Sequence, residues 1–277
     1  MLPIINIGAL KLSTWRGLVL TGVVLCWILF SIRAKKLGYS FYVVFLLLLL
    51  GLPVGTLGGH LFNKMIPVIL GAHAAPHSFA GLTVIGSIVS CLVFSFFYVK
   101  YVVKTQPMKF LDEVAFAFPL SVLVGRIGCL FAGCCYGRLA PESIKTSFLS
   151  VFTLPVDFYV KPSHAWNAYQ GFPPDSLIWN LPLFLMINAL LVLVVTEIIY
   201  RKREKWNLYP GTVIAATCTL YTCGRFLIEF MRKEEMVANT MLNPWQIAIL
   251  LFCFISLLWF SLSLYRRTRL LTPQLSS

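Results

Sequence analysis

Charge is the property that this sequence has least of. Only 12% of its 277 residues are charged, whereas soluble domains average about 25%. Acidic residues are the scarcest, with 10 Asp and Glu against 23 Lys and Arg, and 58% of the chain is hydrophobic. A soluble globular surface needs more polar groups than this chain has. The composition therefore excludes a soluble domain and predicts an all-α, polytopic membrane protein.

Residues that commonly bind metals are few and are not spaced as metal ligands. Cys129, Cys134 and Cys135 follow a C-x4-C-C pattern, and Cys218 and Cys223 a C-x4-C pattern, neither of which is a zinc spacing. These spacings therefore argue against a metal site. Packing as small apolar residues is the leading interpretation of these cysteines, with an outer-side disulfide and a catalytic thiol left open. No basic stretch interleaved with aromatics lies outside the apolar segments, which argues against nucleic acid.

Apolar runs recur along the chain, and each is long enough, at about 18 residues or more, to cross a hydrocarbon core of roughly 30 Å. We predict seven membrane-spanning helices in a single transmembrane domain, 1–277. The expected spans are 15–32, 41–62, 78–99, 113–136, 179–200, 210–231 and 244–265. The first run has no small-residue cleavage site and ends in basic residues, which predicts a helix and not a cleavable signal peptide.

The connections between these spans alternate in basic content. One side of the membrane receives Arg33, Lys35, Lys36, Lys100, Lys104, Lys109, Arg201, Lys202, Arg203, Lys205, Arg266, Arg267 and Arg269. The other side is more dilute and has acids beside its cations, as in Arg232-Lys233-Glu234-Glu235. The positive-inside rule then predicts an N-terminus outside and a C-terminus in the cytoplasm, and the cations are expected to attract anionic membrane lipids.

The one long connection, 137–178, falls on the outer side in this arrangement. It is rich in aromatic residues and prolines, among them Phe148, Phe152, Trp166 and Tyr169. A disordered segment would lack these apolar groups. We therefore predict that 137–178 forms a small extracytoplasmic cap on the membrane surface.

Two arginines lie inside membrane-length apolar segments, Arg126 in the fourth span and Arg225 in the sixth. A charge at mid-helix costs at least about 2.5–3.5 kcal/mol in a bilayer, so it persists where it is paired, faces water or is used. The predicted orientation places both arginines, together with His60 and Glu229, in the outer half of the membrane. Because guanidinium groups bind phosphate in a bidentate fork, this convergence predicts one anion-binding site.

Structural interpretations remain open for parts of this pattern. Arg225 and Glu229 could form a buried i,i+4 pair, although that pair would not account for Arg126. Glycines such as Gly125 permit close helix packing as well as ligand approach. A single histidine at a helix end, such as His60, is more often an interfacial hydrogen-bonding residue than a base.

The segments around these residues resemble a known family nearly from end to end. The matching stretches are Ile7-Gly8, Trp15-Arg16-Gly17-Leu18, Gly58-Gly59-His60-Leu61, Ala80-Gly81-Leu82-Thr83, Gly125-Arg126-Ile127-Gly128, Gly133 through Gly137, Pro210-Gly211, Tyr221-x3-Arg225-Phe226-x2-Glu229-x2-Arg232, and Gln246. On these residues the chain resembles the bacterial prolipoprotein diacylglyceryl transferase family, and the motif that ends in Arg232 is the most specific match.

The resemblance implies transfer of diacylglycerol from phosphatidylglycerol to the lipobox cysteine thiol of a prolipoprotein signal peptide. The reaction would take place at the outer leaflet of the bacterial inner membrane and use no cofactor. The site residues implied are Arg126, Arg225, Glu229 and His60 as catalytic groups, and Gly125, Tyr221, Arg232, Arg16 and Thr83 as substrate-binding groups. Two alternatives are a phospholipid-dependent transferase with another acceptor, and a non-catalytic membrane protein that binds anionic lipid. A redox or thiol-exchange role is a separate interpretation of Cys129, Cys134 and Cys135.

Several positions depart from the family pattern. Ile85 stands where the resemblance expects a histidine, Cys129 where it expects an asparagine and Cys134 where it expects a glutamate. Arg16 replaces a tyrosine, and His60 replaces an arginine. The arginines expected to bind phosphate are kept, while polar groups expected to orient lipid and activate the thiol are replaced, which motivates the two alternatives.

Overall fold

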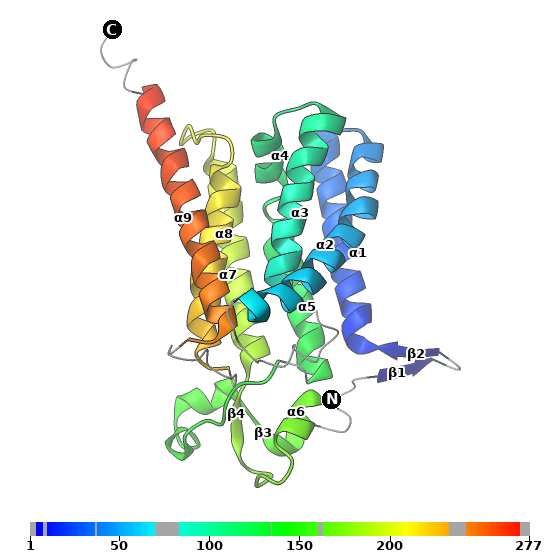
Figure 1. Cartoon of the computed structure of the whole chain (residues 1–277), viewed down its shortest axis with the longest axis vertical. Coiled ribbons are helices and arrows are strands. Elements are labelled where there is room, and N and C mark those ends of the chain that lie inside the picture. The colour runs from blue at the N-terminus through cyan, green and yellow to red at the C-terminus, as the bar shows by residue number, and fades with distance from the viewer. Residues whose placement is uncertain are drawn as a thin grey trace. The chain divides into compact units, whose positions relative to one another are not determined.

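A computed structural model of the chain describes residues 4–7, 10–36, 38–69, 83–133, 135–159, 163–232 and 242–271, and these are mostly helical (Figure 1). Within this part, six helical stretches are long and apolar enough to cross a membrane. The predicted all-α, multi-pass membrane fold is therefore confirmed. The long helices are α1 (Thr14–Lys36), α2 (Phe41–Ile69), α3 (Val84–Tyr98), α5 (Ala117–Ala132), α7 (Leu181–Lys202), α8 (Thr212–Glu229) and α9 (Pro244–Leu271).

Helix α8 corresponds to the predicted sixth span but differs from the other six. It has the length of a span, 18 residues, yet it contains Arg225 and Glu229 and is not among the six apolar stretches. Nine consecutive residues, Gly211–Thr219, are buried. This first half of α8 is therefore covered by protein and not by lipid, whereas Leu220 and Leu227 in the second half are exposed.

The fourth predicted span, 113–136, begins earlier and ends earlier in the structure. A short helix, α4 (Pro107–Val114), has its proline in the first turn and precedes α5. Helix α5 ends at Ala132 because Gly133 adopts a left-handed φ of +62°, the usual conformation just after a helix. A five-residue π-helix, η1 (Val99–Val103), extends α3 towards α4.

The short elements were not expected from the sequence. Strands β1 (Ile4–Ile7) and β2 (Leu10–Ser13) pair antiparallel before α1. The segment 137–178 contains the 3-10 helices η2 (Glu142–Ile144), η3 (Phe148–Phe152) and η4 (Val156–Phe158), the strands β3 (Thr153–Pro155) and β4 (Leu177–Trp179), and helix α6 (His164–Ala168).

The chain divides into two compact units. Unit 1 comprises Met1–Leu25, Leu120–Leu191 and Gly224–Glu234, and unit 2 comprises Cys26–Pro119, Val192–Cys223 and Glu235–Ser277. Each unit combines segments that are far apart in the sequence. The helices α1, α5, α7 and α8 each contribute one end to unit 1 and the other end to unit 2.

In unit 1, segment 137–178 folds around a small core of its own. Val156, Tyr159, Ala165, Tyr169 and Ile178 are buried together. Strands β3 and β4 pair antiparallel, and with α6 they form one small lobe (Figure 1). The aromatic residues of this segment therefore contribute to a folded lobe, which we call the cap.

In unit 2, glycines let α2 and α3 pack closely. A Cβ built on Gly58 would collide with Ser90, and one built on Gly86 would lie 2.5 Å from the Cβ of Phe62. The hydroxyl and the amide of Thr83 both donate to the carbonyl of Gly59, each at 3.2 Å. Small residues at such a crossing are typical of packed membrane helices.

Several charged groups of unit 2 form ion pairs with one another. Glu113 accepts hydrogen bonds from Tyr200 and from Arg203 at 2.6 Å, and Arg33 and Arg201 each donate to Glu197 at 2.9 Å. We call Arg33, Glu113, Glu197, Arg201 and Arg203 the unit 2 ion network. Burial opposes the charge on Arg203, but the bond to Glu113 outweighs it and raises the arginine's pKa.

The carboxylate of Asp112 binds the start of α8. It accepts from the amide of Gly211 at 2.7 Å and from that of Ile214 at 2.9 Å. Gly211 has a φ of +94°, which a residue with a side chain rarely adopts. The Pro210-Gly211 pair noted in the sequence thus forms a turn whose free amides are satisfied by a carboxylate that also interacts favourably with the helix dipole.

Candidate functional site

The most concentrated charge of unit 1 lies at the end of α8. Glu229 is completely buried and forms ion pairs with two arginines of its own helix end, Arg225 at 2.5 Å and Arg232 at 3.2 Å. The side chains of these arginines are 10% and 19% exposed. We call Arg225, Glu229 and Arg232 the arginine cluster. The buried i,i+4 pair considered from the sequence is present, and the carboxylate also holds a second guanidinium.

Helix α8 is held against α7 at the residue that precedes this cluster. A Cβ built on Gly224 would collide with the side-chain amide of Asn188. Only a glycine allows this approach without a shift of one helix. The contact sets the position of α8 one residue before Arg225, so it helps to determine where the arginine cluster lies in unit 1.

The end of α8 is also joined to the beginning of the cap. The amide of Arg138 donates to the carbonyl of Met231 at 2.9 Å, and Gly137 and Arg232 form an isolated antiparallel bridge. The amide of Gly137 donates to the carbonyl of Trp179 at 3.0 Å. Three segments of unit 1, after α5, before α7 and after α8, therefore meet at Gly137.

Gly137 has no room for a side chain. A Cβ there would lie 2.6 Å from the Cβ of Trp179 and would collide with Leu181. The hydroxyl of Tyr169 donates to the Gly137 carbonyl at 2.6 Å. Burial, and secondarily the neighbouring Tyr136, raises the pKa of Tyr169 to about 12, so this hydroxyl keeps its proton and remains a donor at neutral pH.

Arg126 lies on α5 and is buried, with 7% of its surface exposed. Its Nη1 donates to the sulfur of Cys135 at 3.2 Å and contacts the sulfur of Cys129 at 3.8 Å. Cysteine sulfur is a weak hydrogen-bond acceptor. The two cysteines thus belong to the surroundings of Arg126, which goes beyond the packing role favoured from the sequence. Cys134 lies outside the described residues.

The remaining predicted site residues are divided between the units. Gly125 lies beside Arg126 on α5, and Arg16 lies in the first turn of α1 in unit 1, with its side chain outside the described part. Tyr221, His60 and Thr83 belong to unit 2. The ring of Tyr221 packs edge-on against Phe118 at 4.7 Å.

His60 and Thr83 are linked through the backbone that lies between them. Thr83 binds the carbonyl of Gly59, the residue before His60. His60 itself is exposed on α2. The structure therefore brings together Arg225, Glu229 and Arg232 directly, places Arg126 and Gly125 in the same unit, and pairs the segment of His60 with Thr83.

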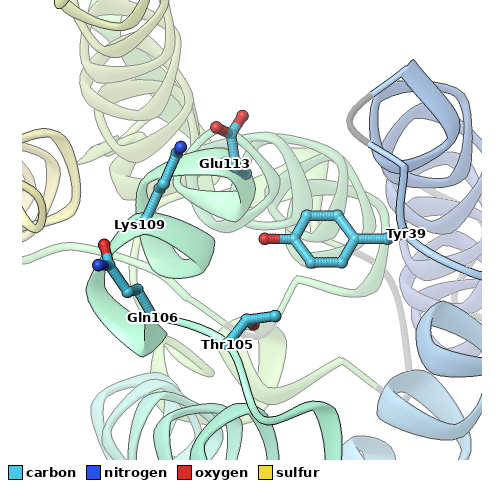
Figure 2. Close-up of a pocket in the computed structure, with 5 residues that line it drawn as sticks. All are labelled: Tyr39, Thr105, Gln106, Lys109 and Glu113. Atoms are coloured by element: carbon cyan, nitrogen blue, oxygen red, sulfur yellow. The ribbon is translucent and has the colours of Figure 1, made fainter.

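A pocket of about 420 Å³ lies in unit 2, and none of the residues that line it is among those predicted as the site. Figure 2 shows its lining residues, Tyr39, Thr105, Gln106, Lys109 and Glu113, with the Tyr39 hydroxyl directed into the space among them. Burial raises the pKa of Tyr39. Glu113 is already engaged by the unit 2 ion network. All five residues come from the end of unit 2 where the sequence predicts the basic, cytoplasmic loops.

Sequence inspection missed Asn188 and Asp112 as positioning residues. Asn188 is the one polar residue in the apolar run 181–195, and that isolation was the available signal. Asp112 precedes Glu113 at the edge of a span, but its partners, Gly211 and Ile214, are about 100 positions away. Nothing local in the sequence connects them.

The charge balance in unit 1 favours an anionic ligand. Glu229 is the only acidic residue in the sequences of α5 and α8, which also contain Arg126 and Arg225. Glu229 carries one negative charge, whereas the guanidiniums of Arg126, Arg225 and Arg232 carry three positive charges. A partly dehydrated surplus of guanidinium charge is the arrangement that binds phosphate and carboxylate groups with bidentate geometry.

Known proteins that resemble this chain match it over most of its length. Residues 3–262 match the model of a family described as prolipoprotein diacylglyceryl transferase. A phosphatidylglycerol–prolipoprotein diacylglyceryl transferase of Clostridium tetani is 25% identical over 271 residues, covering 96% of this chain and 100% of the relative. Phosphatidylglycerol–prolipoprotein diacylglyceryl transferase 1 of Clostridium perfringens is 28% identical, covering 83% of this chain and 82% of the relative. The transferase of Streptococcus uberis is 24% identical, covering 84% of each chain.

Proposed function

This chain belongs to the prolipoprotein diacylglyceryl transferase family, and we propose that it transfers diacylglycerol from phosphatidylglycerol to the lipobox cysteine thiol of a prolipoprotein. The observation that carries the proposal is the buried arginine cluster in the same unit as Arg126. Phosphatidylglycerol is anionic, and its departing glycerol phosphate requires positive charge. The names of the relatives supply the substrate classes.

The reaction forms one bond and breaks one. The thiol sulfur attacks the carbon of the diacylglycerol moiety that bears the phosphate ester, a carbon–sulfur bond forms, and the carbon–oxygen bond to phosphate breaks. The oxygen keeps the bonding electrons, so glycerol phosphate leaves as an anion. Arg126, Arg225 and Arg232 are proposed to bind that phosphate and to stabilise the charge that develops as it departs.

Glu229 is better suited to positioning than to accepting a proton. Its carboxylate is fully buried and holds both Arg225 and Arg232. Those contacts engage both of its oxygens and fix the direction of the two guanidiniums. His60 is exposed and is the candidate that accepts the thiol proton, because a neutral imidazole has one ring nitrogen that can accept a proton.

The remaining predicted residues are proposed to bind substrate. Gly125 leaves space beside Arg126, since a Cβ there would have only Val19 near it, at 3.9 Å. Tyr221 lies one turn before Arg225 on α8. Thr83 lies at the start of α3 and Arg16 in the first turn of α1.

We further propose that the protein is a multi-pass protein of the bacterial cytoplasmic membrane, organised as one transmembrane domain with 137–178 as an extracytoplasmic cap. The basic loops predict an N-terminus outside and a C-terminus in the cytoplasm. The arginine cluster would then lie at the outer leaflet, where exported prolipoproteins arrive.

The first test is complementation of a strain depleted of its own diacylglyceryl transferase, with mass spectrometry of a reporter lipoprotein's cysteine. The wild-type chain should restore the diacylglyceryl adduct. Arg126→Ala and Arg225→Ala should each lower adduct formation by about 100-fold or more, the typical cost of removing one group that stabilises transition-state charge. Arg201→Ala, in an exposed arginine of the unit 2 ion network, is the control and should retain the activity.

The alternatives give different results in the same system. Phosphatidylglycerol binding without an adduct on any acceptor would support a lipid-binding protein. An adduct on another acceptor, lost in Arg225→Ala, would support a transferase of different specificity. Unchanged activity in both arginine variants would contradict the proposed site.

A further inference from the structure

Three neighbouring apolar side chains of the cap are not used in its core. Phe148 is 78% exposed, Leu149 46% and Val151 63%, all on η3. The cap buries other apolar groups around Tyr169 and Ile178. Large apolar groups gathered on a folded surface mark an interaction site, so these three residues, which we call the η3 surface, require a partner.

Contacts within unit 1 place the η3 surface at the level where α7 begins. Phe152, the last residue of η3, stacks on Phe184 with ring centroids 5.2 Å apart and planes 21° apart. The amide of Asn180 donates to the carbonyl of Phe152 at 2.9 Å. Strand β4 runs directly into α7 (Figure 1), and α7 is one of the apolar stretches long enough to cross a membrane.

This level corresponds to the boundary between headgroups and acyl chains. Phe184 is the fourth residue of α7, hence only about 5 Å along the helix from its start. Trp179 packs beside Phe184 with ring centroids 6.0 Å apart. Aromatic residues gather at membrane interfaces because one part of the ring is apolar and the boundary is wet. The lipid-facing side of α7, with Leu190 and Leu191 exposed, continues from this aromatic group.

The backbone of η3 is suited to that boundary. The hydroxyl of Ser147 accepts from the amide of Leu149 at 3.3 Å, and the hydroxyl of Thr153 donates to the carbonyl of Ser150 at 2.7 Å. Polar groups that are satisfied inside the segment lower the cost of leaving water. Apolar side chains on a segment capped in this way can enter lipid without exposing free amides to it.

From this geometry we infer that the η3 surface inserts into the lipid interface and anchors the cap to the bilayer. The partner is the membrane itself, because the surface continues an interface that α7 already makes with lipid. The anchor would hold the Gly137 junction, where cap and α8 meet, at a constant depth. The inference does not depend on the proposed reaction or on which side of the membrane the cap lies.

Photo-cross-linking of the full chain in phosphatidylethanolamine–phosphatidylglycerol vesicles tests the inference. A benzophenone amino acid replaces Phe148 or Val151, and phospholipid adducts are measured by mass spectrometry. The same amino acid at Leu190 on α7 shows that the protein is inserted. At Phe172, an exposed cap residue that packs on Tyr169, it gives the background of the cap.

Adduct yields at positions 148 and 151 should approach that at 190 and exceed that at 172 by about fivefold or more. Yields at 148 and 151 equal to the background at 172, with a strong adduct at 190, would overturn the anchor. Adducts with an added prolipoprotein in place of lipid would also overturn it and identify the η3 surface as a protein-docking site. Loss of transferase activity has no bearing on any of these yields.

Discussion

Unit 1 and unit 2 each bury carboxylates against arginines, and they differ in how completely the charges cancel. Glu113 and Glu229 are equally hidden, at 1% and 0% exposure. In unit 2, Glu113 and Glu197 form ion pairs with the three arginines of the unit 2 ion network, and a third carboxylate, Asp112, lies close enough to Arg203 to interact with its charge. In unit 1, Glu229 holds two arginines by itself, and Arg126 is buried on another helix.

The comparison shows that burial of an ion pair does not by itself indicate function. A balanced network satisfies its members and leaves no net charge for a ligand, so it contributes position and stability. A buried surplus of guanidinium charge is costly in a membrane and is tolerated where an anion completes it. Charge balance therefore distinguishes the two regions better than the identity of the residues.

The largest expected effect separates the two carboxylates. Glu229→Gln leaves Arg225 and Arg232 without their shared counter-charge, which costs about 3–5 kcal/mol when a buried pair is broken and should lower transferase activity by about 100-fold or more. Glu113→Gln, the matched change in the unit 2 ion network, should destabilise the protein similarly. Activity per folded molecule should remain near wild type. Unfolding temperature and adduct formation are measured on both.

Equal loss of specific activity in these two variants would break the comparison, because the unit 2 ion network would then also serve the reaction. Full activity of Glu229→Gln would remove the arginine cluster from the proposed site.

A backbone substitution should give the next largest effect. Gly137→Ala places a Cβ against Leu181 and Trp179, which must both move away from residue 137. Overpacking of this kind typically costs about 1–3 kcal/mol. Because Gly137 joins the cap to the end of α8, activity should fall along with thermal stability. Gly17→Ala, at a helical glycine with nothing within 4 Å of its Cβ, is the control and should be neutral or slightly stabilising. A Gly137→Ala protein with wild-type stability would show that this junction is not tight.

Removal of the carboxylate at the start of α8 is expected to have a moderate effect. In Asp112→Asn one acceptor oxygen facing Gly211 or Ile214 becomes a donor, so a bond to a helix amide is lost at a cost of about 0.5–2 kcal/mol. Thermal unfolding in detergent measures the loss. Adduct formation at a permissive temperature should be unchanged, since Asp112 belongs to the balanced region. A loss of activity without a loss of stability would contradict that assignment.

The smallest effect concerns the cap surface and its dependence on pH. Lys145 and Asp175 form an exposed ion pair at 2.8 Å. The bond from Lys145 lowers the pKa of Asp175. The ion pair therefore contributes to the stability of the cap above the unfolded pKa of the carboxyl, and this contribution is lost as the pH falls through the lower folded pKa. The protection factors of the cap amides, which are corrected for the intrinsic pH dependence of exchange, should fall slightly on acidification in wild type. Asp175→Asn should already show the lower protection factors at pH 7 and lose that dependence. Exchange identical in both proteins would show that the pair is fully screened.

Much of the helical framework was predictable because a span needs only local apolar length. The expected spans agree with α1, α2, α7, α8 and α9 to within a few residues at most of their ends. The end of α5 could not be located by hydropathy, since the left-handed Gly133 stops the helix within an apolar run. The description of α3 begins at Val84, and 70–82 lie outside the described residues.

The candidate site was predictable in part for the same reason. Arg225, Glu229 and Arg232 share a helix end, so their spacing alone placed them together, and the pairing is observed. Contacts across the chain had no such local signal. The sulfur neighbours of Arg126 and the approach of Asn188 to Gly224 depend on how helices and loops meet.

The sequence by itself determined that this protein is a bundle of apolar helices carrying buried arginines, because the cost of charge in lipid and the length of a span are properties of single segments. Only the tertiary structure decided which charges cancel. Whether Glu113 meets Arg203, or Gly137 meets the end of α8, depends on contacts between residues about 90 positions apart, which are made when the helices pack and which no local pattern encodes.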